Sequence, residues 1–394
     1  MTQALNALYP PNKQSFKAFL DKSLSLQNLG LVSNAPIANL DGFDFSSSII
    51  YATNADREQS LQPSESTAHK NLAFSLVELK LKISPLLSTS GARGWANSHK
   101  KSDLIKATRA INRAIPSYNI IFFLSPTHLS ITFATRRFHK SRTIHTDIVE
   151  KITLIKDIDL ANPSQAHTRN LESIAKIIPK EIDNYYGEIL EALSISALNK
   201  EFYAKILVHF ADFVENLTLP NISPFPAEGD KGGGYDTTQK REFILRLLSR
   251  IIFCKFLEKK GIISDNLWDT NLSADYYHEV LEPLFFTTLN TPQDSRDYGF
   301  LPPQIVEILS TIPYLNGGLF SPQTSDYFIP SNPHAHANTL KIDNALFDRL
   351  FATLNSYHFT IDEADESAEE VALDPELLGQ IFESLLSQLS QTIS

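Results

Sequence analysis

The segment Tyr118–Leu124, which ends in the apolar run Ile120–Leu124, limits the folds open to this chain of 394 residues more than any other feature. The run contains no charged residue and is followed by the turn residues Ser125 and Pro126. An uninterrupted apolar stretch of this length, bounded by turn signals, is typical of a buried strand. The helical pattern of Lys101–Ile115 precedes it and ends at Pro116, which cannot continue a helix. The sequence therefore predicts a helix that leads directly into a buried strand.

Other segments of the first 165 residues extend this pattern. The segment Leu129–Arg137 alternates apolar and polar residues, as a half-exposed strand does. Further strands are expected at Asn71–Lys82 and Lys151–Asp159, and a helix at Asn12–Leu24. The sequence thus predicts an α/β domain at residues 1–165.

After Asn162 and Pro163 the apolar residues recur at helical spacing. We expect a first helical lobe at residues 166–220, a linker at 221–236 that contains three consecutive glycines, and a second helical lobe at 237–394. The pattern after the linker predicts one long core helix that stops at Gly261. The fold class is therefore α+β, with an α/β domain followed by an all-α connector.

The charge of the chain is distributed unevenly. The formal net charge is −10, but Lys80–Arg142 holds twelve Lys or Arg residues and one acid, Asp103, a charge of +11. The rest of the chain therefore carries −21, and Asp362–Glu376 alone contains eight acids and no base. A basic segment in an acidic protein predicts a face that binds a polyanion. The alternative is a basic surface that contacts only water.

Composition excludes several classes of protein. The longest apolar runs are far too short to span a membrane, and the first 25 residues lack the pattern of a signal peptide. Cys254 is the only cysteine, which excludes a disulfide framework and a cysteine-based zinc site within one chain. We therefore expect a cytoplasmic protein with no membrane partner.

Eight segments, in this order along the chain, resemble a known family. They are VELK (77–80), TRAINRAIP (108–116), ATRRFHK (134–140), EKITLIKDIDLANPSQAH (150–167), RLLSRIIFCKFLEKKGII (246–263), YYHEVLEPLFFTTLNT (276–291), IPYLNGGLF (312–320) and ALDPELLGQIFESLL (372–386). Together they resemble the N-terminal region of type IIG restriction-modification enzymes and their phage-defence relatives, from about residue 70 to residue 386. The resemblance implies a nuclease-like domain of the PD-(D/E)xK type at 1–165, a helical connector, and then an adenine-specific DNA methyltransferase.

The methyltransferase motifs of that family are absent from the sequence. The resemblance implies a Gly-rich loop for S-adenosylmethionine and an Asn/Asp-Pro-Pro-Tyr/Phe motif that stacks a flipped adenine. This chain has neither, since Pro302 and Pro303 are followed by Gln304. We therefore expect the front part of a longer enzyme, truncated at the entry to the methyltransferase, with S-adenosylmethionine bound only through the missing domain.

Metal-dependent DNA cleavage requires acids that hold a divalent cation such as Mg²⁺ and a Lys near the scissile phosphate. Glu78 and Lys80 supply the Glu-x-Lys pair at the end of an expected strand and, two residues apart, would share one of its faces. A first acid must complete the set, and Asp56, which precedes Glu78 by a hairpin-like separation, is the candidate that we name as catalytic residue and metal ligand. Other candidates for the first acid are Asp41, Asp44 and Glu65. The alternative is a strand end with two solvated charges.

Two groups of basic residues flank this expected core. Three of the first group, Lys106, Arg109 and Arg113, are spaced three and four apart and form one stripe of a helix. Such residues neutralise phosphates and give affinity for double-stranded DNA rather than sequence recognition. The alternative is a solvated helix face. The full set of expected DNA-binding residues is Lys100, Lys101, Lys106, Arg109, Arg113, Arg136, Arg137, Lys140 and Arg142.

Two functions fit these features. The first is the N-terminal part of a restriction-modification protein that binds duplex DNA and cleaves it with a divalent metal. The second is a non-catalytic DNA-binding and docking module that partners a DNA adenine methyltransferase. The amphipathic segment Ala372–Leu386 would, by the resemblance, lead into that methyltransferase.

Overall fold

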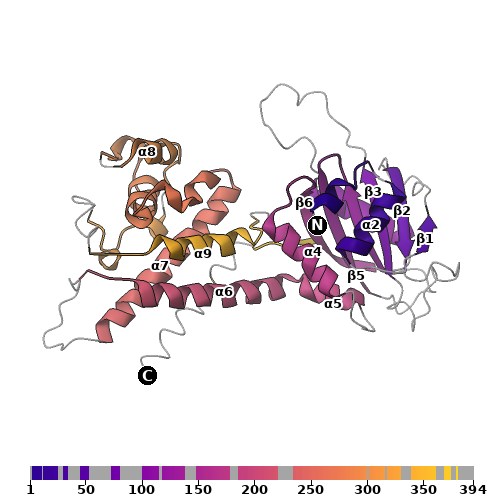
Figure 1. The fold of residues 1–394 in the computed structure, drawn as a ribbon, viewed down its shortest axis with the longest axis horizontal. Helices are drawn as coiled ribbons and strands as arrows, with labels where there is room; N and C mark the ends of the chain where they lie inside the picture. The colour runs from indigo at the N-terminus through magenta and orange to yellow at the C-terminus, as the bar shows by residue number, and fades with distance from the viewer. Residues whose placement is uncertain are drawn as a thin grey trace. The chain divides into compact units, whose positions relative to one another are not determined.

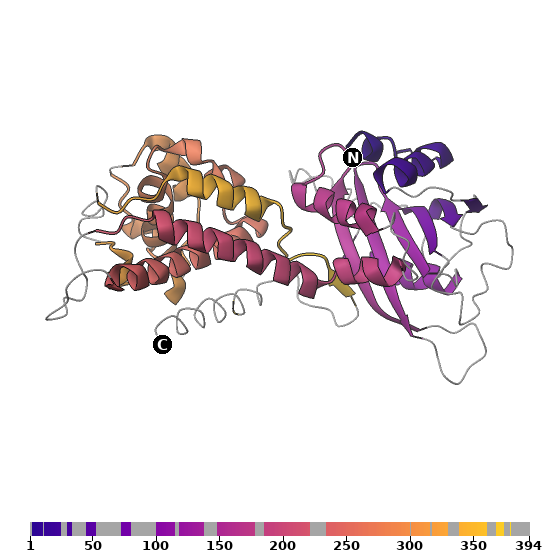
Figure 2. The same cartoon turned by 60° about the horizontal axis from the view of Figure 1, so that its bottom comes forward.

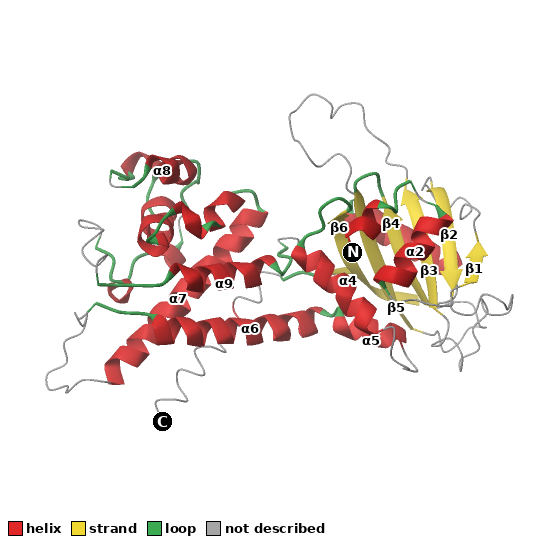
Figure 3. Cartoon of the chain, in the orientation of Figure 1, coloured by secondary structure: helices red, strands yellow, loops and turns green. Residues whose placement is uncertain are grey.

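A computed structural model of the chain describes residues 2–10, 12–24, 30–33, 45–52, 72–79, 100–114, 118–137, 148–177, 185–220, 234–299, 301–315, 317–329, 339–360, 368–373 and 379. The chain divides into two compact units. Unit 1 comprises Met1–Leu198 and Glu363–Ala372, and unit 2 comprises Asn199–Asp362 and Leu373–Ser394. Strands occur in the first unit and helices in both, as Figure 3 shows. The predicted α+β class is confirmed.

Unit 1 is built on a mixed sheet whose seven described strands follow the order of the sequence. All neighbours pair antiparallel except β3 with β4 and β6 with β7, which pair parallel. The strands are β1 (Gly30–Ser33), β2 (Phe45–Ala52), β3 (Leu72–Leu79), β4 (Tyr118–Leu124), β5 (His128–Arg137), β6 (Ile148–Asp159) and β7 (Ala368–Glu370). The helices of this unit are α1 (Thr2–Asn6), α2 (Lys13–Ser23), α3 (Lys101–Ala114), α4 (Gln165–Ile177) and α5 (Tyr185–Ala192).

The two faces of the sheet are covered by different helices. On one face the rings of Phe16 and Phe19 in α2 meet Phe122 of β4 edge-on, and Figure 1 shows α2 over the strands. On the other face Thr108 of α3 hydrogen-bonds to Thr132 of β5, with 2.8 Å between the hydroxyl oxygens. Since Phe122 and Thr132 occupy positions of opposite parity in the paired strands, α2 and α3 lie on opposite faces. Strand β4 is therefore buried on both sides, as its apolar run predicted.

One hydroxyl group completes the hydrogen bonding of β5 beyond Thr132, the last residue of β5 that pairs with β4. Tyr186 of α5 accepts a hydrogen bond from the backbone N–H of Ala134 (2.7 Å) and donates one to its carbonyl oxygen (2.9 Å). The ring of Tyr186 also packs against Tyr118, with 4.8 Å between the centroids. Buried backbone groups require partners, so this side chain takes the place of a backbone partner from β4.

Strand β7 was not predicted. It belongs to the acidic stretch near the end of the chain and pairs Ala368, Glu369 and Glu370 with β6. Nothing in three residues that include two acids indicates a strand; only the pairing with β6 makes them one. The sequence analysis placed this segment in the second helical lobe, whereas the structure adds it to the sheet of unit 1.

Unit 2 contains helices of three kinds. The α-helices are α6 (Ile195–Asn216, which begins at the end of unit 1), α7 (Gly234–Lys259), α8 (Pro303–Ser310) and α9 (Asn344–Asn355). Short 3₁₀ helices are η4 (Asp265–Trp268), η5 (Thr270–Leu272), η8 (Gln293–Ser295), η9 (Gly318–Phe320) and η10 (Thr324–Asp326). Two π-helices are η6 (Tyr277–Leu281) and η7 (Pro283–Leu289). Helices α6 and α9 lie side by side (Figure 2), joined by a hydrogen bond between His209 and Thr353.

The long core helix predicted after the linker is α7. It starts at Gly234, inside the segment expected as linker, and ends before Gly261, whose φ of 72° favours glycine. A later segment forms a pair of π-helices, η6 and η7, with Pro283 at the start of the second. Proline has no N–H to donate within a helix, which favours such a change of register.

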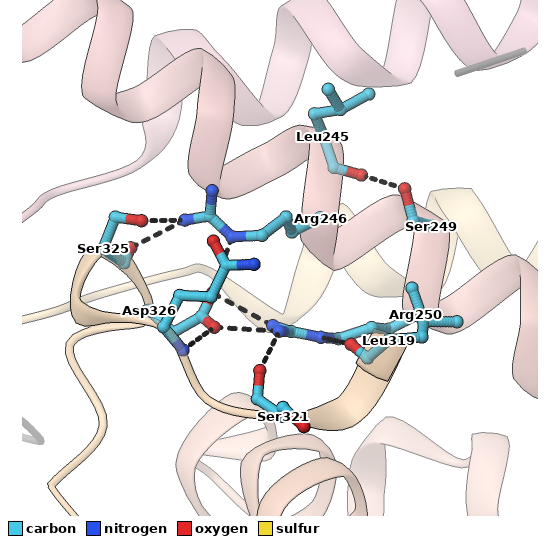
Figure 4. A network of polar contacts seen from close by, with 9 residues as sticks. Leu245, Arg246, Ser249, Arg250, Leu319, Ser321, Ser325 and Asp326 are labelled. Atoms are coloured by element: carbon cyan, nitrogen blue, oxygen red, sulfur yellow. Dashed lines mark hydrogen bonds and ion pairs between the residues drawn. The ribbon is translucent and has the colours of Figure 1, made fainter. Parts of the chain in front are cut away.

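A buried carboxylate ties a loop of unit 2 to α7. Asp326 is fully buried and accepts hydrogen bonds from Arg246 (2.9 Å) and from both terminal nitrogens of Arg250 (3.0 and 2.8 Å), as Figure 4 shows. Arg250 also donates to the carbonyl oxygen of Leu319, and its guanidinium lies over the ring of Phe286 at 4.8 Å. A charge removed from water must be paired in this way, so the network fixes the loop on the helix.

The charges of this network lower the pKa of the Asp326 carboxyl. Burial by itself raises the pKa of the Asp326 carboxyl, but the hydrogen bonds and charges of Arg250 and Arg246 outweigh it. The pKa therefore lies below the usual value for Asp. Asp326 thus stabilises the fold above the ordinary pKa of Asp, and this contribution is lost as the pH falls through the lowered pKa.

Among the described residues, no helix has the length and apolar character required to cross a bilayer.

We predict that Asp326→Ala lowers the free energy of unfolding by about 3–5 kcal/mol, because it leaves Arg250 buried without its partner. Urea unfolding at neutral pH measures this loss. The exposed Asp294 provides the control, since Asp294→Ala removes the same group from water. The difference between wild type and Asp326→Ala should shrink as the pH falls below about 4, where the carboxyl is neutral in the unfolded chain. A difference that stays constant down to pH 3 would contradict the ion pair's role.

A second prediction concerns the attachment of α3 to the sheet. Thr108 and Thr132 are both fully buried. Thr108→Val leaves the hydroxyl of Thr132 without a partner and should lower the free energy of unfolding by about 1–3 kcal/mol. Thr108→Val combined with Thr132→Val should be nearly neutral, because neither polar group remains. Thermal unfolding of the single and double variants measures this, and strictly additive losses would show that the bond does not couple the two residues.

Candidate functional site

Glu78 lies at the end of β3, where its backbone pairs with Ser47 of β2 and Leu124 of β4. The structure describes the backbone of Glu78 and not its side chain. Lys80 and Asp56 lie outside the described residues. The expected Glu-x-Lys pair therefore begins at a strand end in the middle of the sheet, between an antiparallel neighbour and a parallel one.

The register of β2 and β3 bears on the first acid. The two strands are antiparallel, so Phe45 at the start of β2 pairs with Leu79, and Ala52 at its end pairs with Ala73. Asp44 directly precedes Phe45 in the chain, whereas Asp56 follows Ala52. The six residues from Ala73 to Glu78 span about 17 Å of strand. Phe45 thus lies at the Glu78 end of the strand pair, and Ala52, four residues before Asp56, lies at the other end. Asp44 and Asp56 themselves lie outside the described residues.

A polar turn lies next to Glu78 in the sheet and was not predicted as part of the site. Ser125 and His128 close the β4–β5 turn, with the N–H of Ser125 donating to the carbonyl oxygen of His128 (2.8 Å). The Nδ1 atom of His128 lies 2.8 Å from the hydroxyl oxygen of Thr127, and Asp159 pairs with His128 across β5 and β6. Only the tertiary pairing brings these residues to the end of the sheet where Glu78 lies.

The described neighbours of Glu78 belong to the face that α2 covers. Leu76 pairs with Phe122, the residue that meets Phe16 and Phe19, and Leu124 follows Phe122 by two residues. The basic helix α3 covers the opposite face. The candidate metal-binding end and the basic helix thus do not form one pocket within a single face of the sheet.

Helix α3 has one buried face and one basic face. Its buried residues are Leu104, Ile105, Ala107, Thr108, Ile111 and Asn112. Lys100 and Lys106 are exposed, and Lys101 and Arg109 are half-buried. Arg113 lies on the same helix, so the helical spacing that predicted the stripe of 106, 109 and 113 is present.

The second basic group lies at the far end of β5 from Glu78. Arg136 and Arg137 end this strand, whose other end pairs Leu129 with Leu124, the neighbour of Glu78. The nine residues from Leu129 to Arg137 span about 27 Å. Lys140 and Arg142 lie outside the described residues. Glu78 and the basic residues Arg136 and Arg137 are thus separated by the length of β5.

No group of three or more His, Cys, Asp or Glu side chains among the described residues could hold a metal ion. The candidate ligands named from the sequence, Glu78 and Asp56, are not among the side chains that the structure describes. Their chemistry suits Mg²⁺, because carboxylate oxygens are the protein ligands that this hard cation prefers.

Cys254 is fully buried in α7, and burial raises the pKa of its thiol. The aromatic residues Tyr276, Tyr277, Phe285 and Phe286 are buried as well, so they belong to the core and offer no exposed platform for stacking bases. None of these residues contributes to the candidate site.

Comparison with known proteins gives one relative of note. The chain is 35% identical over 283 residues to a protein of Methanocaldococcus jannaschii named "Putative type II restriction enzyme and methyltransferase". The aligned part covers 63% of this chain and 23% of the relative, so the chain spans about a quarter of that protein. No family model and no solved structure matches the chain. By sequence, this chain is thus similar to one part of a restriction-modification protein.

Proposed function

We propose that this chain is the N-terminal, DNA-cleaving part of a restriction-modification protein of the type IIG class. The observation that carries the proposal is the order of elements around Glu78. Strands β2 and β3, helix α3 and strands β4 and β5 follow one another. Nucleases of the PD-(D/E)xK type share this order of two strands, a helix and two strands, with an acid at one strand end and Glu-x-Lys on the next strand. The similarity to the Methanocaldococcus jannaschii protein supports the same class.

In this proposal Glu78 and a second acid hold Mg²⁺, and Lys80 lies near the attacked phosphate. The metal would polarise a phosphoryl oxygen and activate the attacking water. The register of β2 and β3 favours Asp44 as the second acid over Asp56, the residue first named. Methyl transfer from S-adenosylmethionine belongs to a methyltransferase domain or partner subunit.

Duplex DNA would be held by phosphate contacts at two places. Helix α3 offers Lys100, Lys106, Arg109 and Arg113, and the end of β5 offers the basic residues from Arg136 onward. The length of about 27 Å from the Glu78 end to Arg137 equals roughly eight base pairs at 3.4 Å each. Contacts at the two ends of β5 would therefore lie about eight base pairs apart on one duplex.

The cleavage proposal predicts the behaviour of four variants. Glu78→Gln, Lys80→Ala and Asp44→Asn should abolish cutting of duplex DNA in Mg²⁺ or Mn²⁺, because each removes a metal ligand or the phosphate-side Lys. Asp56→Asn is the matched control and should cut like the wild type. Gel analysis of a plasmid substrate measures cutting, and fluorescence anisotropy verifies that each variant still binds DNA.

The opposite results discriminate between the alternatives. Loss of cutting in Asp56→Asn with Asp44→Asn active would restore Asp56 as the metal ligand. Wild-type protein that binds duplex DNA and does not cut it in either metal would contradict the enzyme and support the non-catalytic docking module.

A separate prediction concerns DNA binding by α3. Lys106→Ala combined with Arg109→Ala should weaken binding uniformly across sequences and reduce the slope of log K against log salt by about 1 for each lost phosphate contact. Titrations between about 50 and 200 mM salt measure that slope. The control is Lys260→Ala, which removes an exposed Lys from unit 2. An affinity that does not depend on salt would contradict phosphate binding altogether.

A further inference from the structure

Helix α6 has two apolar faces, and the described residues pack closely on one of them. Its core face is formed by Phe202, Ile206, His209 and Phe213, all buried. The opposite side carries a second row of apolar residues at spacings of three and four, as an amphipathic helix would show toward a partner. We call this row the outer face of α6; it consists of Ala204, Leu207, Val208, Ala211 and Val214.

The outer face is open among the described residues. Val208 is 61% exposed, more than any other large apolar side chain that the structure describes. Ala204 and Ala211 are exposed, and Leu207 and Val214 are half-buried. Ala204 and Ala211 lie seven residues apart, which is two helical turns. Their small side chains let another helix approach α6 closely.

We infer that the C-terminal amphipathic segment of this same chain, residues 375–386, docks on the outer face of α6. Its apolar residues recur at the spacing of one helix face: Leu377, Leu378, Ile381, Phe382, Leu385 and Leu386. Gly379, which is helical and exposed, falls at the edge of this apolar face, seven residues before Leu386. The inference concerns the packing of unit 2 and does not depend on the proposed nuclease function.

The position at which the segment starts supports this occupant. The N–H of Leu373 donates to the carbonyl oxygen of His358 (2.7 Å), and the N–H of Thr360 donates to the carbonyl oxygen of Leu373 (2.8 Å). The neighbouring Phe359 packs edge-on against Phe202 in the first half of α6. The segment therefore leaves the described fold beside α6, in the same unit.

A second contact fixes the entry point on the flank of α6. The hydroxyl of Tyr357 donates to the carboxylate of Glu201 (3.0 Å), and the Nζ of Lys205 lies 5.1 Å from the centre of the Tyr357 ring. From Leu373, the chain to Leu377 reaches at most about 14 Å. That reach is enough to pass around the flank of a helix about 10 Å wide.

The lengths and the sizes of the two faces also agree. From Ala204 to Val214 the outer face runs about 15 Å, and a helix from Leu377 to Leu386 runs about 14 Å. The segment has large apolar side chains and the outer face has two alanines, so the large side chains of the segment can pack over the small alanines of α6. Docking removes both apolar surfaces from water, which is the driving force.

Hydrogen exchange of the full chain tests the inference. Amides of residues 377–386 should exchange at least about tenfold more slowly than in Ala211→Glu, which places a charge in the contact. The matched control is Ala345→Glu, at an exposed position of α9. It should leave exchange of the segment unchanged. Fast exchange of 377–386 in the wild type, or equal protection in Ala211→Glu, would overturn the inference.

A substitution in the segment itself tests the inference without changing α6. Phe382→Asp should release the segment, while the thermal unfolding transition of unit 2 stays unchanged. In a Val208→Cys background, Phe382→Asp should increase the rate of maleimide labelling of the cysteine severalfold. Cys254 is buried and does not compete for the reagent.

Cross-linking identifies the occupant. Val208→Cys combined with Phe382→Cys should form a bismaleimide cross-link within one chain, at a rate that does not depend on protein concentration. Cross-links between chains would show that a second copy covers the face. Absence of any cross-link would indicate that another protein covers the outer face. Cross-links between chains or the absence of cross-links would each overturn the inference.

Discussion

The parallel pairing of β3 with β4 is the constraint on which the candidate site depends. Parallel neighbours cannot be joined by a tight turn, so the chain must cross one face of the sheet before it returns. Helix α3 makes this crossing, and the Thr108–Thr132 hydrogen bond fixes it on the face opposite α2. The same pairing places Glu78 beside Leu124 in the middle of the sheet. The position of the candidate acid and the position of the basic helix thus have one cause.

Unit 2 depends on a different kind of interaction. Its long helix α7 is buried along most of its length, and two of its arginines bind Asp326, a carboxylate with no exposure to water. The fold must pair this charge because an isolated buried carboxylate is strongly unfavourable. Arg250 also holds the carbonyl oxygen of Leu319, so two short 3₁₀ turns are fixed to one helix. Sequence spacing gives no sign of this pairing, since Arg250 and Asp326 are 76 residues apart.

The proposed function depends on the end of β3 and on two basic surfaces. Likeness of fold does not by itself establish an activity, so the proposal names Glu78 and Lys80 as the residues for cleavage. Phosphate contacts from α3 and from the end of β5 would supply affinity for duplex DNA without reading its sequence. The similarity to one part of a protein named as a restriction enzyme and methyltransferase supports the same class.

The sequence by itself determined the elements whose signals are local. The apolar run of β4, the helix that Pro116 ends, and the end of α7 at Gly261 follow from periodicity and backbone preference, which act over a few residues. The tertiary structure decided what depends on distant partners. It made residues 368–370 a strand, because β6 offered an unpaired edge. It also used the Tyr186 hydroxyl to complete the hydrogen bonds of β5, and it set the register of β2 against β3. Such pairings bring together residues far apart in the chain, and no local pattern records them.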